Sequence, residues 1–103
     1  MLHFKELDPL LHSQLRLAIT SLLISVESAE FTFIKEKTGA TSGNLSVQLD
    51  KLEKAGYITI SKSFRDKRPL TTCKISNKGI KAFEAYVETL KSYIQTKNKS
   101  PGK

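Results

Sequence analysis

A tight turn, an amphipathic segment and two strand-like runs follow one another without interruption between residues 38 and 76. The turn is Thr38-Gly39-Ala40-Thr41, and the amphipathic segment is GNLSVQLDKLEKAGY. The runs YITISKSF and LTTCKIS alternate apolar with polar positions and are rich in β-branched residues, which predicts two half-buried strands. The basic stretch Arg65-Asp66-Lys67-Arg68-Pro69 separates them and predicts the loop of a hairpin. Few small folds accommodate a helix that is entered through a short turn and leads directly into a hairpin.

This order predicts a winged helix-turn-helix, an α+β and mostly helical fold. Such a fold has a three-helix core and a β-hairpin wing, and here it would also have a long C-terminal helix. Its geometry places one helix in the DNA major groove and the hairpin tip against the neighbouring backbone or the minor groove. The predicted helices cover residues 10–26 with Asp8 as cap and Pro9 first, 30–38 ended by Gly39, 41–55, and Asn77 onward with Ser76 as cap.

The third predicted helix carries the candidate DNA-reading face. Its inward stripe is Leu45, Leu49 and Leu52, so the remaining sides are free for contacts. Side-chain amides can pair with adenine, a valine can meet a thymine methyl group, and a glycine allows close approach of the backbone. A plain amphipathic helix with a solvated face is the alternative, and the adjoining turn and hairpin favour DNA reading. The candidate residues are Thr41, Ser42, Gly43, Asn44, Val47, Gln48 and Lys51.

The hairpin tip, residues 64–69, adds three positive side chains, which are Arg65, Lys67 and Arg68. Arginine at a loop tip can enter a minor groove or bind phosphate. We expect Asp66 to orient a neighbouring arginine through an ion pair, and Pro69 to stiffen the exit from the loop. The alternative is a solvent-exposed turn whose charges discourage edge pairing.

Net charge is distributed unevenly along the chain. Residues 1–60 carry six Lys/Arg against seven Asp/Glu, whereas residues 61–103 carry eleven against three, and the whole chain is +7. The basic excess therefore begins at the hairpin, as expected for a protein that binds a polyanion. Solubility alone could explain a basic chain, so the charge supports DNA binding only together with the helix and the hairpin.

The first and last predicted helices each carry an apolar stripe. The first stripe is Leu11, Leu15, Ala18, Leu22 and Val26, widened by Ile19 and Leu23. The last helix has apolar residues at spacings of three, four, three and four, which is a heptad seam. The seam either packs on the first helix or forms a dimer interface. A core of two short helices and a hairpin cannot cover both stripes, which favours a homodimer that matches a palindromic operator. The predicted interface residues are Leu15, Leu22, Val26, Ile80, Phe83, Val87, Leu90 and Ile94.

Several other classes of protein find no support in the sequence. No phosphate-binding loop, dinucleotide motif or paired catalytic carboxylates are present, so we predict neither an enzyme nor a cofactor. His3 and His12 lie far from each other and from the single Cys73, so no metal site is expected. Cys73 falls on the predicted inner strand face and indicates a reducing compartment. With no apolar run near ~20 residues and no signal peptide pattern, we expect a cytoplasmic protein without membrane contact.

Three pieces of sequence carry a family resemblance, which are TSGNLSVQLDKLEKAGYI, FRDKRP and ISNKGIKAF. In this order they resemble small prokaryotic winged-helix transcriptional regulators related to the MarR and ArsR repressors, and the likeness extends over residues 31–90. The resemblance implies DNA contact by Ser42, Gly43, Asn44, Val47, Gln48 and Lys51 in the helix, and by Arg65 and Arg68 in the wing. Metal-sensing ArsR relatives use Cys or His clusters, which the chain lacks. Nothing in the sequence specifically supports a small-molecule effector.

We therefore expect a homodimeric, sequence-specific DNA-binding transcriptional regulator. Residues 1–95 would form one domain that includes the dimerisation helix, and residues 96–103 a flexible basic tail. The alternative is a winged-helix protein-interaction module without DNA binding. That module would expose apolar residues on the third helix, where the sequence offers Gly, Asn, Val and Lys. RNA binding would need an aromatic stacking platform, and none is evident.

Overall fold

The computed structural model describes residues 4–99, with side chains up to Ile94. The sheet is antiparallel with strand order β1-β3-β2, and the helices pack beside it. This architecture confirms the predicted winged helix-turn-helix. The elements are α1 (Gln14–Val26), β1 (Ser28–Glu30), α2 (Phe31–Thr38), α3 (Ser42–Lys54), β2 (Ile58–Arg65), β3 (Arg68–Ile75) and α4 (Asn77–Lys99).

The first helix begins four residues later than its pattern predicts. Ser13 is the N-cap, and its side chain accepts from the backbone N–H of Arg16. Asp8 instead caps a separate turn, because its Oδ1 accepts from the Leu10 N–H at 2.9 Å and its backbone carbonyl accepts from the Leu11 N–H. The prediction of Asp8 as the helix cap is therefore wrong. The intervening turn directs Leu11 into the core, where it is fully buried.

The core differs from the predicted stripe of the first helix. Ile19 and Leu23, which were expected only to widen the predicted apolar stripe, are completely buried, whereas Ala18 and Val26 of that stripe are exposed. Because the two sets lie on adjacent sides of one helix, the later start and the packing of the sheet decide which side turns inward. The buried apolar residues are Leu11, Ile19, Leu23, Ala29, Ile34, Leu45, Leu49, Leu52, Ile58, Cys73 and Tyr86.

The short strand β1 was not predicted. It pairs antiparallel with β3, so that Ser28 lies opposite Lys74 and Ala29 opposite Cys73. Three residues are too few to show a strand alternation in the sequence. A positive φ of 69° at Glu27 turns the chain out of α1 and into this strand.

The wing is a long hairpin with a tight turn. β2 and β3 pair from Ile58↔Ile75 to Arg65↔Arg68, which leaves only Asp66 and Lys67 in the turn. Both turn residues have positive φ, 51° and 66°, as type I′ hairpin turns require. The predicted loop from Arg65 to Pro69 is therefore too long, because the strands pair further than their alternation indicates.

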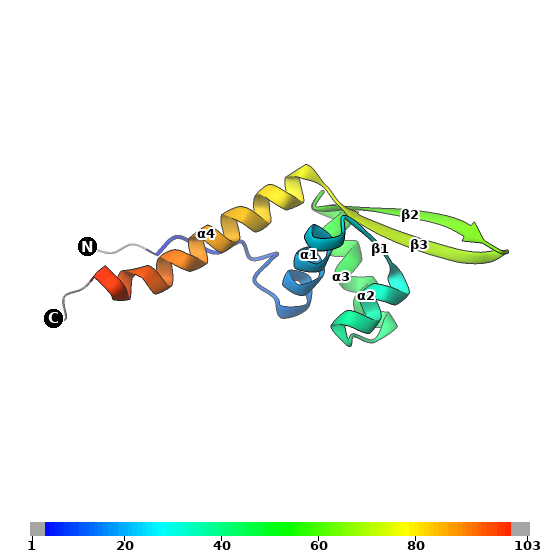
Figure 1. Cartoon of the computed structure of the whole chain (residues 1–103), viewed down its shortest axis with the longest axis horizontal. Coiled ribbons are helices and arrows are strands. Elements are labelled where there is room, and N and C mark those ends of the chain that lie inside the picture. The colour runs from blue at the N-terminus through cyan, green and yellow to red at the C-terminus, as the bar shows by residue number, and fades with distance from the viewer. Residues whose placement is uncertain (1–3, 100–103) are drawn as a thin grey trace.

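The molecule is elongated. Its extents are 65 × 24 × 21 Å, and its radius of gyration of 16.6 Å exceeds the roughly 13 Å of a compact chain of this length. Figure 1 shows the reason, since the wing and α4 extend in opposite directions from the body formed by α1, α2 and α3. α4 continues through residues 96–99, which the sequence analysis assigned to the tail, and residues 100–103 lie outside the described part of the chain.

Ser76 fixes the start of α4, as predicted. Its Oγ accepts from the Gly79 N–H at 3.0 Å and donates to the Gly56 carbonyl at 2.5 Å. One side chain thus joins the C-terminal end of α3 to the first turn of α4. Within residues 4–99, no helix is long and apolar enough to cross a membrane.

Candidate nucleic-acid interface

Helix α3 is held in the body by one side and leaves its other sides free. Leu45, Leu49 and Leu52 are buried, as predicted. Thr41 is the N-cap, and its Oγ1 accepts from the Asn44 N–H at 3.2 Å. The preceding turn begins at Gly39, whose φ of 73° ends α2 in the left-handed conformation. This arrangement confirms the predicted helix and leaves the first turn of α3 open to a ligand.

The N-terminal half of α3 presents the predicted DNA-reading residues to solvent. Ser42, Gly43 and Asn44 are exposed, and the side chain of Val47 is 51% exposed. A Cβ atom at Gly43 would meet nothing within 4 Å, so the backbone here is accessible from outside. Lys51 lies one turn further along and is also exposed. Its charge extends the same open surface.

Gln48 and Asn44 of α3 belong to a series of hydrogen bonds that starts on α1. Arg16 donates from Nη1 to Oε1 of Gln48 at 2.5 Å, and from Nε to the Leu10 carbonyl at 2.6 Å. Gln48 then donates from Nε2 to Oδ1 of Asn44 at 2.9 Å. Sequence reasoning missed Arg16, because it is separated from Gln48 by 32 positions and the only signal is that it is the one charged residue of α1.

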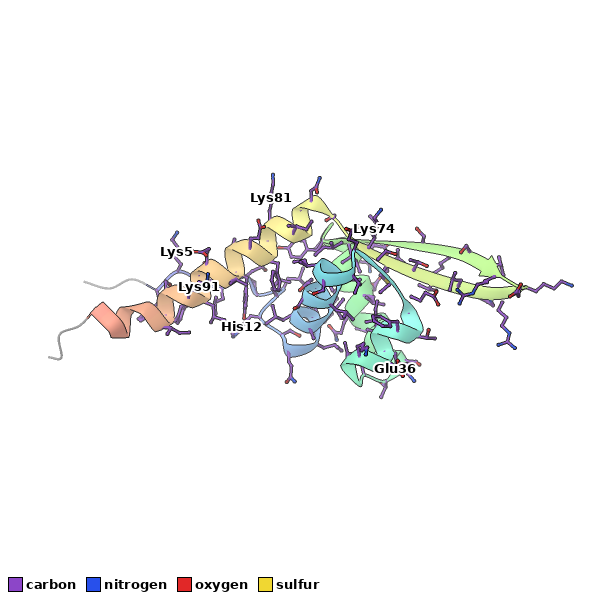
Figure 2. The ribbon with its side chains drawn as sticks, viewed as in Figure 1. Lys5, His12, Glu36, Lys74, Lys81 and Lys91 are labelled. Atoms are coloured by element: carbon purple, nitrogen blue, oxygen red, sulfur yellow. The ribbon has the colours of Figure 1, made fainter. Side chains whose placement is uncertain are left out.

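The wing carries positive side chains from its base to its tip. Figure 2 shows Lys74 at the base, where β3 leads toward α4, and nitrogen-bearing side chains extending from the tip. Lys67 and Arg68 are exposed at the tip. The wing thus provides a projecting basic arm beside the body.

Arg65 is placed differently from the prediction. Its two terminal nitrogens donate to the two carboxylate oxygens of Glu30, each at 3.0 Å. This hydrogen-bonded pairing lowers the pKa of Glu30 and raises that of Arg65. The predicted pairing of Asp66 with a neighbouring arginine is therefore wrong, because the arginine side chain turns back toward β1. Arg65 can contact DNA only by sharing or leaving Glu30.

The C-terminal half of α3 has a different character. Lys54 pairs with Asp50 at 3.0 Å, one turn apart on the exposed surface. Asp50 and Glu53 line a hollow of about 410 Å³ between α3 and the sheet, together with Lys62 of the wing. The carboxylates would repel phosphate, so the side of α3 that carries Asp50 and Glu53 is less suited to DNA than the first two turns and Lys51.

The predicted interface residues divide into two groups. Leu15, Leu22 and Phe83 pack partly against the core, and Ile80 and Val87 are half-buried. By contrast Val26, Leu90 and Ile94 are 40%, 40% and 62% exposed. A mainly apolar hollow of about 350 Å³ lies between α1 and α4, and Leu17, Val87 and Leu90 are part of its lining. The seam of α4 therefore packs on its own domain near its start and is uncovered further along.

Chemical reactivity is suppressed rather than promoted in the described residues. Burial raises the pKa of the Cys73 thiol to about 11, with a smaller contribution from Glu53. Burial, and then the hydrogen bond to Asp8, raises the pKa of Tyr57 to about 12. Among residues 4–94 no three His, Cys, Asp or Glu side chains gather in a way that could hold a metal ion. These groups stabilise the fold, and none is poised to react.

The fold, the capped and exposed α3 and the basic wing define the class of winged-helix DNA-binding proteins. The family model described as winged helix DNA-binding domain matches residues 15–94. The chain belongs to this family. Its members act through DNA binding and are not enzymes, which agrees with the sequence prediction.

The chain is also similar to individual proteins in sequence and in structure. An uncharacterized protein of Methanocaldococcus jannaschii is 42% identical over 76 residues, which cover 74% of this chain and 83% of the relative. A transcriptional regulator homologue from Pyrococcus horikoshii OT3 has a TM-score of 0.79 at 29% identity and covers 84% of this chain and 86% of its own. The predicted resemblance to MarR-like transcriptional regulators is thereby confirmed.

The transcriptional regulator BldR from Sulfolobus solfataricus shares the fold at lower identity. Its TM-score is 0.68 at 20% identity, and the match covers 87% of this chain. The chain spans only 64% of that structure, less than two thirds of its length. The likeness therefore establishes the fold of this chain, which is that of a DNA-binding regulator.

Proposed function

We propose that the chain is a sequence-specific transcriptional regulator that binds DNA as a homodimer. Residues 41–55 would enter the major groove, and wing residues 64–69 would lie on the backbone or in the minor groove. Residues 1–95 would act as one DNA-binding and dimerising unit. The exposed first two turns of α3 are the single observation that carries the proposal, because Gly43, Asn44 and Val47 are open while Leu45 and Leu49 anchor the helix.

The division of labour follows from chemistry. Thr41 and Ser42 lie at the helix N-terminus, where free N–H groups and the helix dipole attract a phosphate. Val47 is an apolar contact for a thymine methyl group, and Lys51 a partner for the backbone. In the wing, Lys67 and Arg68 supply charge that is not tied to a carboxylate in the described contacts. Arg65 would join them when DNA draws it away from Glu30.

The homodimer is supported by the uncovered apolar residues of α1 and α4. Val26, Leu90 and Ile94 lie on the same stripes as half-buried neighbours that already pack in the domain. A second copy related by a two-fold axis would cover both stripes and place two copies of α3 on one face of a duplex. The predicted operator is then a palindrome with half-sites about one helical turn, roughly 10 base pairs, apart.

Selection from a random duplex library tests the function. Purified protein is incubated with the library at low salt, and bound duplexes are recovered and sequenced over several rounds. We expect enrichment of a palindromic sequence. Recovery of no duplex above a bead-only control would contradict DNA binding and favour the protein-interaction module instead. Enrichment of a single, non-repeated half-site would contradict the homodimer while leaving DNA recognition intact.

A further inference from the structure

The chain of hydrogen bonds from Arg16 to Asn44 fixes the orientation of both amides on α3. A guanidinium group can only donate, so Gln48 must turn its Oε1 toward Arg16. The amide is planar, which directs Nε2 of Gln48 the other way, to Asn44. Asn44 must in turn present Oδ1 to that donor. Its own Nδ2 is then left pointing away from Gln48.

The inner end of this chain, Arg16, is held firmly. Arg16 is half-buried, and its Nε is bound to the Leu10 carbonyl at 2.6 Å, so the guanidinium group cannot swing freely. Gln48 is half-buried at its contact with Arg16, whereas Asn44 is exposed. Gln48 and Asn44 are one helical turn apart and face the same side. Asn44, the outer end of these hydrogen bonds, therefore lies on the surface proposed to enter the groove.

We propose that Arg16 is a positioning residue that makes Asn44 a hydrogen-bond donor toward DNA and so sets base preference. This inference rests on the proposed function. An amide that pairs bidentately with adenine must offer a donor to N7 and an acceptor to the N6 amino group. The oxygens of Asn44 and Gln48 are already engaged inside the protein. The free Nδ2 hydrogens best suit bases whose major-groove edge shows acceptors without an amino donor, which are guanine, through N7 and O6, and thymine, through O4; adenine shows N7 beside an amino donor.

We call the hydrogen bonds from Arg16 through Gln48 to Asn44 the relay. The relay replaces the expectation that the two amides read adenine. Adenine and cytosine each carry an amino donor in the major groove, which would face the donor hydrogens of Asn44. Guanine and thymine have no such group on their major-groove edges. Because Arg16 belongs to α1, the base preference of the recognition helix is set by a residue that does not itself lie on the reading face.

The experiment uses the full chain and begins with a map of base preference. Binding of the selected duplex and all its single-base variants is measured for the wild type and for Asn44→Ala. The position at which Asn44→Ala loses its preference is the one that Asn44 reads. At this position the wild type should prefer guanine or thymine over adenine and cytosine by about tenfold. A preference for adenine there, with DNA binding intact, would overturn the relay but not the proposed function.

Gln48→Glu gives the sharpest variant. The introduced carboxylate only accepts hydrogen bonds, so it still pairs with Arg16 but forces Asn44 to turn Nδ2 toward it. Asn44 then presents Oδ1 to the groove, and the preference at its position should shift to adenine or cytosine. The added negative charge will weaken binding to all duplexes, so the readout is the ratio between bases rather than the affinity. An unchanged ratio contradicts the relay.

Arg16→Met and Arg16→Lys form a matched pair. Methionine retains length but donates nothing, so both amides can rotate and the preference should fall by about tenfold, to near none. Lysine retains one donor and should keep most of the preference. Thermal unfolding followed by circular dichroism checks that both variants are folded. Equal base preference in Arg16→Met and the wild type would contradict the inference. If the wild type binds no duplex at all, the proposed function fails together with the relay.

Discussion

At the scale of the residue, Tyr57 ties the segment before α1 to the body. Its hydroxyl donates to Oδ2 of Asp8 at 2.5 Å. Burial and then Asp8 raise the pKa of Tyr57 from 10.0 to about 12. Burial disfavours the charged phenolate, and the Asp8 carboxylate accepts a hydrogen bond from the neutral hydroxyl and repels the phenolate. The folded protein therefore holds this proton more tightly than the unfolded chain does. The hydrogen bond links the turn at Asp8 to Tyr57, shortly after the end of α3.

The stabilising effect of this proton is present below pH 10 and should be lost as the pH rises from 10.0 to about 12. The measurement compares wild type with Tyr57→Phe, so that other effects of alkaline pH are common to both proteins. Denaturant unfolding at several pH values between about 8 and 11.5 gives the free energy of unfolding of each. We expect the difference between the two proteins to shrink as the pH rises. A difference that stays constant would show that Tyr57 does not carry the effect.

Two substitutions should distinguish contacts to base edges from contacts to the DNA backbone. Arg68→Ala removes a proposed contact to the DNA backbone and should weaken binding to specific and random duplexes alike. Asn44→Ala removes a proposed base contact, which should cost about 1–3 kcal/mol on the selected duplex and little on random DNA. Fluorescence anisotropy with both duplexes measures this. Lys81→Ala is the control, since it removes one charge from α4, where Figure 2 shows this side chain projecting outward. Equal losses on both duplexes with Asn44→Ala would remove it as a reader.

At the scale of the element, two helix starts differ in their need for glycine. Gly79, in the first turn of α4, is buried, and a Cβ atom there would collide with the Tyr57 carbonyl and reach Cγ1 of Ile75 at 3.0 Å. Gly43, in the first turn of α3, has open space. Gly79 is thus required by the packing of α4 on the end of α3. Gly43 is not required by packing, so a ligand can approach its backbone.

Alanine at the two sites makes a matched pair. Alanine gains up to about 1 kcal/mol of helix propensity over glycine at either position. We therefore expect Gly43→Ala to be neutral or mildly stabilising, and Gly79→Ala to lose about 1–3 kcal/mol through overpacking. Thermal unfolding of both variants tests this. If Gly79→Ala unfolds at the same temperature as Gly43→Ala, α4 does not pack closely on Tyr57.

The elements also show how far the sequence can be used for prediction. Capping residues and strong periodicity identify α3, the start of α4 and the buried side of the sheet, because these signals are local. The start of α1 and the existence of β1 depend on partners far along the chain, namely Tyr57 and β3. The same holds within the site. Residues of α3 are found from the helix pattern, whereas Arg16 and the pair Arg65–Glu30 are revealed only by the fold.

At the scale of the whole molecule, the uncovered seam of α4 predicts assembly. Leu90→Asp places a carboxylate on the exposed part of the stripe, where a partner would bury it at considerable cost. We expect the wild type to be a dimer in solution and this variant a monomer. Ala85→Asp is the control, because Ala85 is exposed on the side of α4 opposite the heptad seam. Light scattering at micromolar concentration measures all three proteins.

A monomeric variant should also bind DNA much more weakly, because two half-sites no longer share one binding event. A monomeric wild type, or Leu90→Asp that remains a dimer, would show that α4 serves its own domain only. If both aspartate variants dissociate, the effect is one of charge on α4 and not of the seam.

If the basic wing and α3 bind duplex DNA, the affinity should depend steeply on salt concentration. A dimer that makes roughly 6–10 phosphate contacts should lose about a thousandfold or more in affinity between about 50 and 200 mM salt. The measurement is a titration of labelled duplex at several salt concentrations, repeated with Arg68→Ala, whose slope should be shallower because it makes fewer contacts. A steep slope in the wild type and a reduced one in the variant is the predicted result. Absence of duplex binding at the lowest salt, or an affinity that does not change with salt, would contradict DNA binding through the wing and α3.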